Sequence, residues 1–341
     1  MNKSVENILL VRLSAIGDII LMSTLIRCLR KQYPSARIDI IVKKQYVSLL
    51  EANPHISTIY PLDTSLGFKG LKELKNSLKK TPYDVFLITH KNFRTLYLRF
   101  FLIAKKHYTY KKETLKRTLL TELGIDLYNP PIPVFLRYLN TAKKLGVEYD
   151  GLRTEFFISP QIRNIFFDRY PNLQKSNRKK IAICPGASFK NKQWLTEYYL
   201  ELIEKLFIHY EVDIFLLGGK AEEEICKYLE EETSNSVINF AGKLSLQESA
   251  IILEMCHVTV VGDTGMLHLS EALGTPVVGI YGPTSEQLGF YPILPQSKVA
   301  EVKLKCRPCT KMGLDKCPKK HFRCMKDINP SMVFELIQSI L

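Results

Sequence analysis

Short apolar runs that alternate with helix-like segments are the feature that most constrains this chain. Each run ends at turn residues, and a segment with apolar residues at helical spacing follows it. In the first half the runs lie at 7–13, 36–42, 56–62 and 83–89, and helix-like segments lie between them at 18–33, 47–53 and 71–80. Short apolar strands that alternate with helices are typical of a parallel sheet covered on both faces. The chain is therefore predicted to be an α/β protein.

A polar stretch at 169–180 interrupts the pattern and predicts a linker, because it lacks apolar periodicity. The alternation then restarts, with strand-like runs at 180–186, 212–219, 237–242, 257–263 and 276–283 and helix-like segments at 196–209, 221–232, 246–256 and 265–273. A length of 341 residues suits two domains. We expect Rossmann-like domains at 1–170 and 171–330, facing each other across a cleft. The pattern of 331–341 predicts an amphipathic helix, which we expect to pack back on the N-terminal domain.

The first run ends in the turn LSAIGDII, residues 13–20, which is a poor match to a dinucleotide site. A dinucleotide-binding turn has three glycines, whereas this turn has only Gly17. It also carries a carboxylate, Asp18, where a phosphate site would have no acid. Ligands of open α/β sheets bind beyond the carboxyl ends of the strands, so Asp18 is nonetheless placed where a ligand is expected.

A stronger candidate for phosphate binding follows the run at 257–263. There Asp263, Thr264 and Gly265 precede a predicted helix, and His268 lies one turn into it. The first N–H groups of a helix are unpaired and its dipole is positive there, so a phosphate is well placed. The same residues are also consistent with an ordinary N-cap and a core histidine.

Three other loops follow strands in the second half. The loop at 185–194 has a small-residue turn that includes Ser188, and Lys190 and Lys192 could neutralise a diphosphate. The acids in the loop at 218–224 could accept ribose hydroxyls or merely complement a helix dipole. The loop at 279–287 could bound a nucleotide pocket or be an ordinary connection.

The net charge of +14 indicates an anionic partner, and residues 90–117 hold nine Lys or Arg, two His and one acid. A solvated basic face explains such a stretch equally well. Aromatic residues alternate with basic ones within it, which suits contact with an anionic membrane surface. Because no nucleic-acid-binding motif is present, we expect no nucleic-acid partner.

Four cysteines cluster near the end of the chain, spaced C-x2-C-x7-C-x6-C: Cys306, Cys309, Cys317 and Cys324. Four soft ligands could bind structural Zn²⁺ or iron, although the spacing matches no common zinc finger. Reduced thiols or a local disulfide are the alternative. The other cysteines stand singly in apolar contexts, and the sequence shows neither a signal peptide nor a long apolar span. A cytoplasmic protein is expected.

Taken together, the chain resembles the ADP-heptose:lipopolysaccharide heptosyltransferases, glycosyltransferase family 9, which have a GT-B fold. The resemblance covers nearly the whole chain. The segments that carry it are ILLVRLSAIGDIILMSTLIRCLR, PGASFKNKQW, FLLGGKAEEE, VVGDTGMLHLSEALGTPVVGIYGPT and the cysteine-rich CRPC…CPKKHFRCM. The DTGxxH segment followed by GTPxxxxYGPT is specific to this family.

The resemblance implies an inverting transfer from ADP-L-glycero-β-D-manno-heptose to the lipopolysaccharide inner core, of the lipid A-Kdo type. Asp18 would be the catalytic base, and Lys192 would stabilise the departing diphosphate. The donor would be bound by Ser188, Lys192, Glu222, Asp263, Thr264, Gly265 and His268. Among the acids at 222–224, Glu222 is preferred for the ribose. No metal or other cofactor would be required for catalysis.

The acceptor and the location follow from the basic stretch. Lys91, Arg94 and Arg117 are expected to bind the acceptor, with the enzyme peripheral on the inner face of the inner membrane. Two alternatives remain open. One is a protein O-heptosyltransferase, which would need no membrane surface. The other is a degenerate homologue that binds nucleotide or lipopolysaccharide without transfer, which the presence of Asp18 and Lys192 disfavours.

Overall fold

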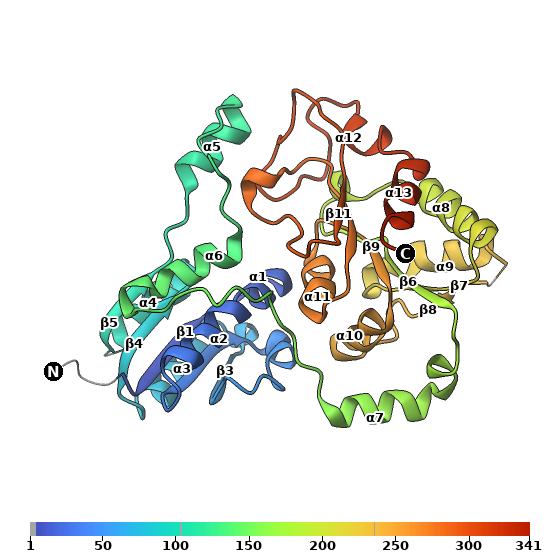
Figure 1. The fold of residues 1–341 in the computed structure, drawn as a ribbon. Helices are drawn as coiled ribbons and strands as arrows, with labels where there is room; N and C mark the ends of the chain where they lie inside the picture. Colours follow the sequence, from blue (N-terminus) through green and yellow to red (C-terminus); the bar gives the residue numbers. More distant parts are fainter. Residues whose placement is uncertain (1–4, 103, 235) are drawn as a thin grey trace. The chain divides into compact units, whose positions relative to one another are not determined.

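The computed structural model describes residues 5–102, 104–234 and 236–341, and it divides into two compact units (Figure 1). The first is formed by residues 1–112 and 134–157, and the second by 113–133 and 158–341. Each unit holds one parallel sheet flanked by helices, as Figure 1 shows. The predicted α/β class with two Rossmann-like halves is therefore confirmed.

The sheet of the first unit has the strand order β3-β2-β1-β4-β5. Its strands are β1 (Asn7–Val11), β2 (Arg37–Lys43), β3 (Thr58–Leu62), β4 (Tyr83–Ile88) and β5 (Ala104–Thr109), and its helices are α1 (Ile16–Leu21), α2 (Ser23–Gln32), α3 (Gly67–Leu78), α4 (Phe93–Phe101) and α6 (Val134–Leu139). The run from Ile8 to Val11 is fully buried, so β1 lies in the centre, between β2 and β4. The turn that contains Asp18 therefore starts from the middle of the carboxyl edge.

Strand β5 and helices α4 and α6 of this unit were not predicted, and the first two lie in or at the basic stretch at 90–117. β5 is an edge strand with exposed lysines, so it lacks the apolar run that marks the other strands. α4 has several exposed aromatic residues, which hide its helical period. The helix expected at 18–33 is present but divides at Met22 into α1 and α2.

The sheet of the second unit has the order β11-β10-β9-β6-β7-β8. Its strands are β6 (Lys179–Cys184), β7 (Val212–Leu216), β8 (Ile238–Asn239), β9 (Val258–Gly262), β10 (Val277–Ile280) and β11 (Lys298–Ala300), and its helices are α5 (Thr114–Leu123), α7 (Pro160–Arg169), α8 (Thr196–His209), α9 (Glu223–Glu232), α10 (Leu246–Met255), α11 (Gly265–Leu273), α12 (Arg323–Lys326) and α13 (Pro330–Gln338). Because all strand pairs are parallel, the loops after β6, β7, β9 and β10 leave from one edge.

Residues 113–133, which we call the arm, belong to the second unit although first-unit segments flank them in the sequence. Leu120 of α5 and Tyr128 pack with Leu288, and Phe290 covers this small cluster. Lys311 also donates to the hydroxyl of Thr118, with 2.7 Å between Nζ and Oγ1. The arm and α7 make these units differ from the ranges expected on either side of residue 170.

The C-terminal helix α13 packs on α8 in the second unit, where Val333 and Ile337 are part of the apolar core. This placement differs from the expected return to the N-terminal domain. Trp194 belongs to the same core, and its ring N–H donates to the carbonyl of Ile328, so it is a packing residue. No helix of the described ranges is long and apolar enough to cross a membrane.

Candidate functional site

Asp18 lies in the first turn of α1, directly after β1, and both of its carboxylate oxygens are engaged. The guanidinium of Arg12 forms an ion pair with Oδ2, and the hydroxyl of Tyr138 donates to Oδ1. The backbone N–H of Ala15 donates to Oδ2 at 3.4 Å. The Asp18 side chain keeps 21% of its surface exposed, so a substrate can still reach it. The structure thus presents a held carboxylate that is open to a ligand.

Arg12 and Tyr138 were missed by sequence reasoning. The Arg12 side chain is nearly buried, and it donates to the carbonyls of Ser14 and Thr89, each at 2.7 Å. Its guanidinium also lies 4.9 Å from the centre of the Tyr138 ring. One feature of the sequence could have identified Arg12, because it is the single charged residue within the apolar run at 7–13. No sequence feature linked Tyr138 to this site, since it comes from α6, far along the sequence.

His90, which follows β4, lies in the same electrostatic environment. Burial and the positive charge of Arg12 together lower the pKa of His90 to about 4, while Asp18 opposes the shift. The imidazole is therefore neutral at neutral pH. Its Nδ1 is buried and has no hydrogen-bond partner among the described residues.

In the second unit, the loops after β6 and β9 meet through an ion pair. The ammonium of Lys192 lies 2.7 Å from Oδ2 of Asp263, and both side chains are only 11% exposed. The hydroxyl of Thr284, in the loop after β10, donates to the same carboxylate oxygen at 2.8 Å. Arg307 then donates to the Thr284 carbonyl at 2.9 Å, so it supports this loop from behind. Sequence reasoning identified the loop at 279–287, which contains Thr284, as a possible pocket boundary but missed the contribution of Arg307.

The helix that we expected to begin near Gly265 is α11, and its N-cap is Thr264 in an extended conformation. The Thr264 side chain makes no capping hydrogen bond, so it leaves the first N–H groups of α11 for a ligand. His268 is almost fully buried, with its ring centre 6.0 Å from that of Phe290. The start of α11 thus agrees with the predicted helix start after Asp263. His268 is mainly a buried packing residue.

Glu222 is the half-buried member of the three acids at 222–224, whereas Glu223 and Glu224 are exposed. Its Oε2 accepts from the N–H of Gly219 at 2.8 Å. The same side chain lies so close to Gly186 that a Cβ there would fall 2.3 Å from it. A larger residue at position 186 would therefore displace the Glu222 side chain, which lies against the turn after β6. Ser188 is exposed in the turn after β6.

The structure gives no support for the metal centre predicted in the cysteine-rich segment, residues 305–324. The described part of the chain contains no group of three or more side chains arranged to hold a metal ion. Cys306 Sγ lies 3.8 Å from His321 Nε2, which gives only a pair. Burial raises the pKa of Cys324 to about 11 and also raises that of Cys309, so both are protonated at neutral pH.

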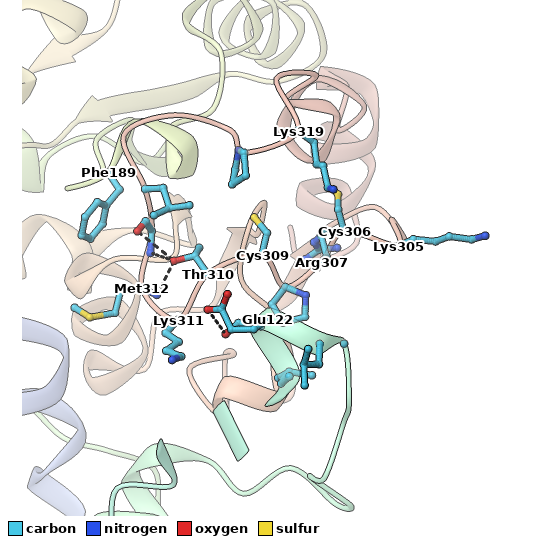
Figure 2. A pocket seen from close by; sticks show the side chains of 18 residues that line it. Glu122, Phe189, Lys305, Cys306, Arg307, Cys309, Thr310, Lys311, Met312 and Lys319 are labelled. Carbon is cyan, nitrogen blue, oxygen red and sulfur yellow. Dashed lines mark hydrogen bonds between the residues drawn. The ribbon is translucent and has the colours of Figure 1, made fainter. Parts of the chain in front are cut away.

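The cysteine-rich segment instead supports the Lys192 loop. The backbone N–H of Asn191 donates to the carbonyl of Leu314 at 3.1 Å, and the Asn191 side chain accepts from the Leu314 N–H at 2.8 Å. Beside these contacts is a cavity of about 790 Å³ between the segment, Phe189 and the end of α5. Figure 2 shows Glu122 on α5 and Cys309 of the segment on its walls.

The three basic residues expected to bind the acceptor do not lie together. Lys91 and Arg94 are exposed at the start of α4 in the first unit. Lys91 also lines a cavity of about 310 Å³ together with Arg99. Arg117 instead lies in the arm and is buried, with its guanidinium 5.9 Å from the centre of the Phe290 ring. Its Nε has no hydrogen-bond partner among the described residues.

Two Rossmann-like units, with a held carboxylate in one and a cationic helix start in the other, are the architecture of a GT-B glycosyltransferase. Residues 71–320 match the sequence profile described as glycosyltransferase family 9 (heptosyltransferase), and the chain belongs to this family. It is therefore a glycosyltransferase.

Similar proteins agree with this assignment. The chain is 27% identical to lipopolysaccharide heptosyltransferase 2 of Salmonella typhimurium, over 98% of each chain. Its fold is similar to that of a family 9 glycosyltransferase from Veillonella parvula, with a TM-score of 0.82, 20% identity and coverage of 100% and 98% of the two chains. It is also similar to the E. coli heptosyltransferase WaaC with ADP-2-deoxy-2-fluoro heptose, with a TM-score of 0.70, 19% identity and coverage of 97% and 99%.

Proposed function

We propose that this protein transfers heptose from ADP-L-glycero-β-D-manno-heptose to the lipopolysaccharide inner core, with inversion at the anomeric carbon. The name of the Salmonella relative supports the sugar and the acceptor, and the ligand of the E. coli structure supports the donor. The observation that carries the proposal is the division of chemistry between the units. The first unit holds the carboxylate of Asp18, which can take a proton, and the second unit holds the ammonium of Lys192 beside Asp263, near the start of helix α11.

In the proposed reaction, Asp18 removes the proton of an acceptor hydroxyl as that oxygen attacks the anomeric carbon of the heptose. The bond from this carbon to the diphosphate breaks, and ADP leaves from the opposite face. Lys192 and the first N–H groups of α11 stabilise the negative charge on the departing diphosphate. Protein cations and N–H groups would thus supply the stabilisation that other transferases obtain from Mg²⁺.

Within the donor site, Asp263 holds Lys192 in place, and the Glu222 carboxylate accepts hydrogen bonds from the hydroxyl groups of the adenosine ribose. Half-burial of Glu222 beside the ends of β6 and β7 supports this role, because its carboxylate is fixed where a nucleotide would lie. Ser188, Thr264, Gly265 and His268 complete the proposed donor-binding set.

Arg117 is the proposed acceptor residue with the strongest structural support. A guanidinium that is buried with an unpaired Nε is costly unless an anion satisfies it. The phosphate and carboxylate groups of the lipopolysaccharide inner core have the required chemistry. Arg117→Gln should raise KM for the acceptor severalfold and leave KM for ADP-heptose unchanged. A change confined to the donor KM would assign Arg117 to the donor instead.

The exposed face of α3 and α4 supports the proposed location on the inner face of the inner membrane. Phe93 and Phe100 on α4 are 71% and 77% exposed. Tyr97 joins the two helices, since its ring centre lies 5.1 Å from that of Phe68 on α3. Exposed cations lie on or next to the same two helices, at Lys69, Lys72, Lys79, Lys80, Lys91, Arg94 and Arg99. Aromatic residues within a basic face suit an anionic bilayer.

Vesicle binding by the full chain tests this location. The protein should sediment with phosphatidylglycerol vesicles and not with phosphatidylcholine vesicles. Replacing both Phe93 and Phe100 by serine should reduce binding about tenfold or more. The control Ile208→Ser removes an equally exposed apolar side chain from α8 and should have no effect. Equal binding to both lipids would contradict the membrane proposal and leave the transfer reaction untouched.

The transfer reaction itself is tested by incubating the protein with ADP-heptose and heptose-deficient lipopolysaccharide, followed by mass spectrometry. An acceptor that gains one heptose, together with ADP formation, is the expected result. Modification of the protein's own or added polypeptides without any labelled lipopolysaccharide would favour a protein O-heptosyltransferase. Binding of ADP without any turnover would favour a non-catalytic homologue.

A further inference from the structure

A carboxylate offers about four lone-pair positions for hydrogen bonds, and the neighbours of Asp18 occupy most of them. Oδ2 is bound by the Arg12 guanidinium and by the Ala15 N–H, and Oδ1 accepts from the Tyr138 hydroxyl. These contacts leave one lone pair, on Oδ1. A proton taken from a substrate hydroxyl would therefore go to Oδ1, the same oxygen that Tyr138 binds.

Tyr138 is itself held firmly. Its ring is buried, it packs edge-on against Tyr110 with 5.2 Å between ring centres, and its other side faces the Arg12 guanidinium. Burial raises the pKa of Tyr138 well above its ordinary value, and the negative charge of Asp18 raises it further. The hydroxyl therefore stays protonated and acts as a hydrogen-bond donor, which rules it out as the base.

Arg12 fixes the other half of the carboxylate. Its Nε and Nη1 are anchored on two backbone carbonyls, so the guanidinium cannot follow Asp18 if the side chain rotates. With donors on both oxygens and the two side-chain donors held in place, the plane of the carboxylate is set. Such preorganisation means that little reorganisation is needed when the proton is transferred.

We infer that Tyr138 is a positioning residue for the transfer reaction, which, together with Arg12, orients Asp18 and directs the free lone pair of Oδ1 to the acceptor hydroxyl. The inference rests on the proposed role of Asp18 as the base. It adds that the carboxylate of the proposed base is held by a hydrogen bond from α6. A donor of this kind favours the ionised form of a carboxylate, so the pH dependence of the rate is the readout that distinguishes it from a purely structural contact.

The charged and titratable groups around this carboxylate come from several elements. Arg12 lies after β1, Tyr138 on α6, and His90 after β4, while Lys43 of β2 and Lys112 after β5 act on His90. Because the pKa of His90 is lowered to about 4, His90 can also titrate within the acidic limb of the rate profile. A change in that limb that follows a change at Tyr138 is therefore assigned to Asp18 only if it persists when His90 is replaced by glutamine.

The first test is the pH profile of Tyr138→Phe in the full chain. We expect kcat to fall about ten- to a hundredfold, because this is the effect of losing a hydrogen bond to a charged group in the transition state. KM for ADP-heptose should stay within about twofold, and the acidic limb should move up by about one pH unit. Tyr110→Phe is the matched control, because it removes a neighbouring hydroxyl without touching Asp18. Its kcat and profile should match the parent protein.

A second variant keeps the inference testable if Tyr138→Phe folds poorly. Incorporation of 3,5-difluorotyrosine at position 138 retains the ring and the hydroxyl but makes the hydroxyl a stronger donor. The acidic limb should then move down in pH, opposite to the shift for phenylalanine. A purely structural role for Tyr138 predicts no shift in either variant, and that result would overturn the inference.

Asp18→Asn, assayed in parallel, distinguishes a failure of the positioning role of Tyr138 from a failure of the base assignment of Asp18. If Asp18→Asn is inactive but both Tyr138 variants keep the parent profile, the base assignment stands and the positioning role is wrong. If Asp18→Asn retains turnover within a few-fold of the parent, the base assignment itself is wrong. The two failures therefore give different patterns of activity.

Discussion

Lys192 Nζ lies 2.7 Å from Asp263 Oδ2, and this ion pair joins the loops after β6 and β9. The side chains are almost fully buried, so solvent screens the pair only weakly. Asp263 therefore does not face an incoming diphosphate as an isolated anion. It holds the cation that we propose to bind that diphosphate.

The pair predicts a non-additive response to mutation. Lys192→Met should lower kcat/KM about a hundredfold or more, because it removes a charge from the leaving group and leaves Asp263 to repel it. Adding Asp263→Asn to Lys192→Met should recover part of the loss. A double-mutant cycle on ADP-heptose turnover measures this. A double variant no better than Lys192→Met would show that the pair has no such coupling.

Asp18→Asn should lose about 10²–10⁴-fold in kcat, the typical contribution of a positioned base. Affinity for ADP should be unchanged, since the residues proposed to bind ADP belong to the second unit. Turnover assays and calorimetric titration with ADP provide the two measurements. A large loss of ADP affinity would contradict the division of roles between the units.

Asn191 should matter for stability and for donor binding, because its side chain accepts from the Leu314 N–H at 2.8 Å in a buried position. Asn191→Ala leaves that N–H unsatisfied, which should lower the free energy of unfolding by about 1–3 kcal/mol. Affinity for ADP should fall severalfold as the Lys192 loop loosens. Urea unfolding and ADP titration check both effects. Asn172→Ala, at an exposed site in the linker, is the control and should change neither quantity.

His90 should make stability depend on pH. An unfolded histidine has a pKa of about 6.5, whereas burial lowers the pKa of His90 to about 4 in the folded chain. Between these values the unfolded state takes up a proton that the folded state does not, so stability falls as the pH drops through this window. Below about pH 4 this group adds no further change. Urea unfolding at several pH values should show a shallower decline for His90→Gln than for the parent protein.

The sequence predicts the strands well where they are central, because a buried parallel strand is apolar along its whole length. β1 and β9 are of this kind, and the residues after them, Asp18 and Asp263, were correctly located at strand ends. Edge strand β5 escaped prediction because its lysines face solvent. The sequence pattern therefore reports burial more reliably than it reports strand pairing.

Partners that come from distant parts of the chain could not be predicted. Tyr138 reaches Asp18 across 120 positions, and no spacing rule links them. Arg307 lies between two cysteines whose spacing suggested a metal site. Its guanidinium instead donates hydrogen bonds to carbonyls of the loop after β10. The spacing of cysteines indicates metal ligands only if the fold brings the side chains together, and no group of three or more potential ligands is present in the described part of the chain.

The arm has a consequence for how the two halves of this enzyme can be separated or exchanged. The chain passes from the first unit to the second at residue 113, returns at 134 and leaves again at 158. Dividing the chain at one point near residue 170 would therefore separate Leu120 and Tyr128 from Leu288 and Phe290, with which they pack. Hybrid enzymes joined at one point would combine the arm of one parent with the second unit of another. Recombination between relatives must then preserve this small contact, so the two halves are expected to be inherited together.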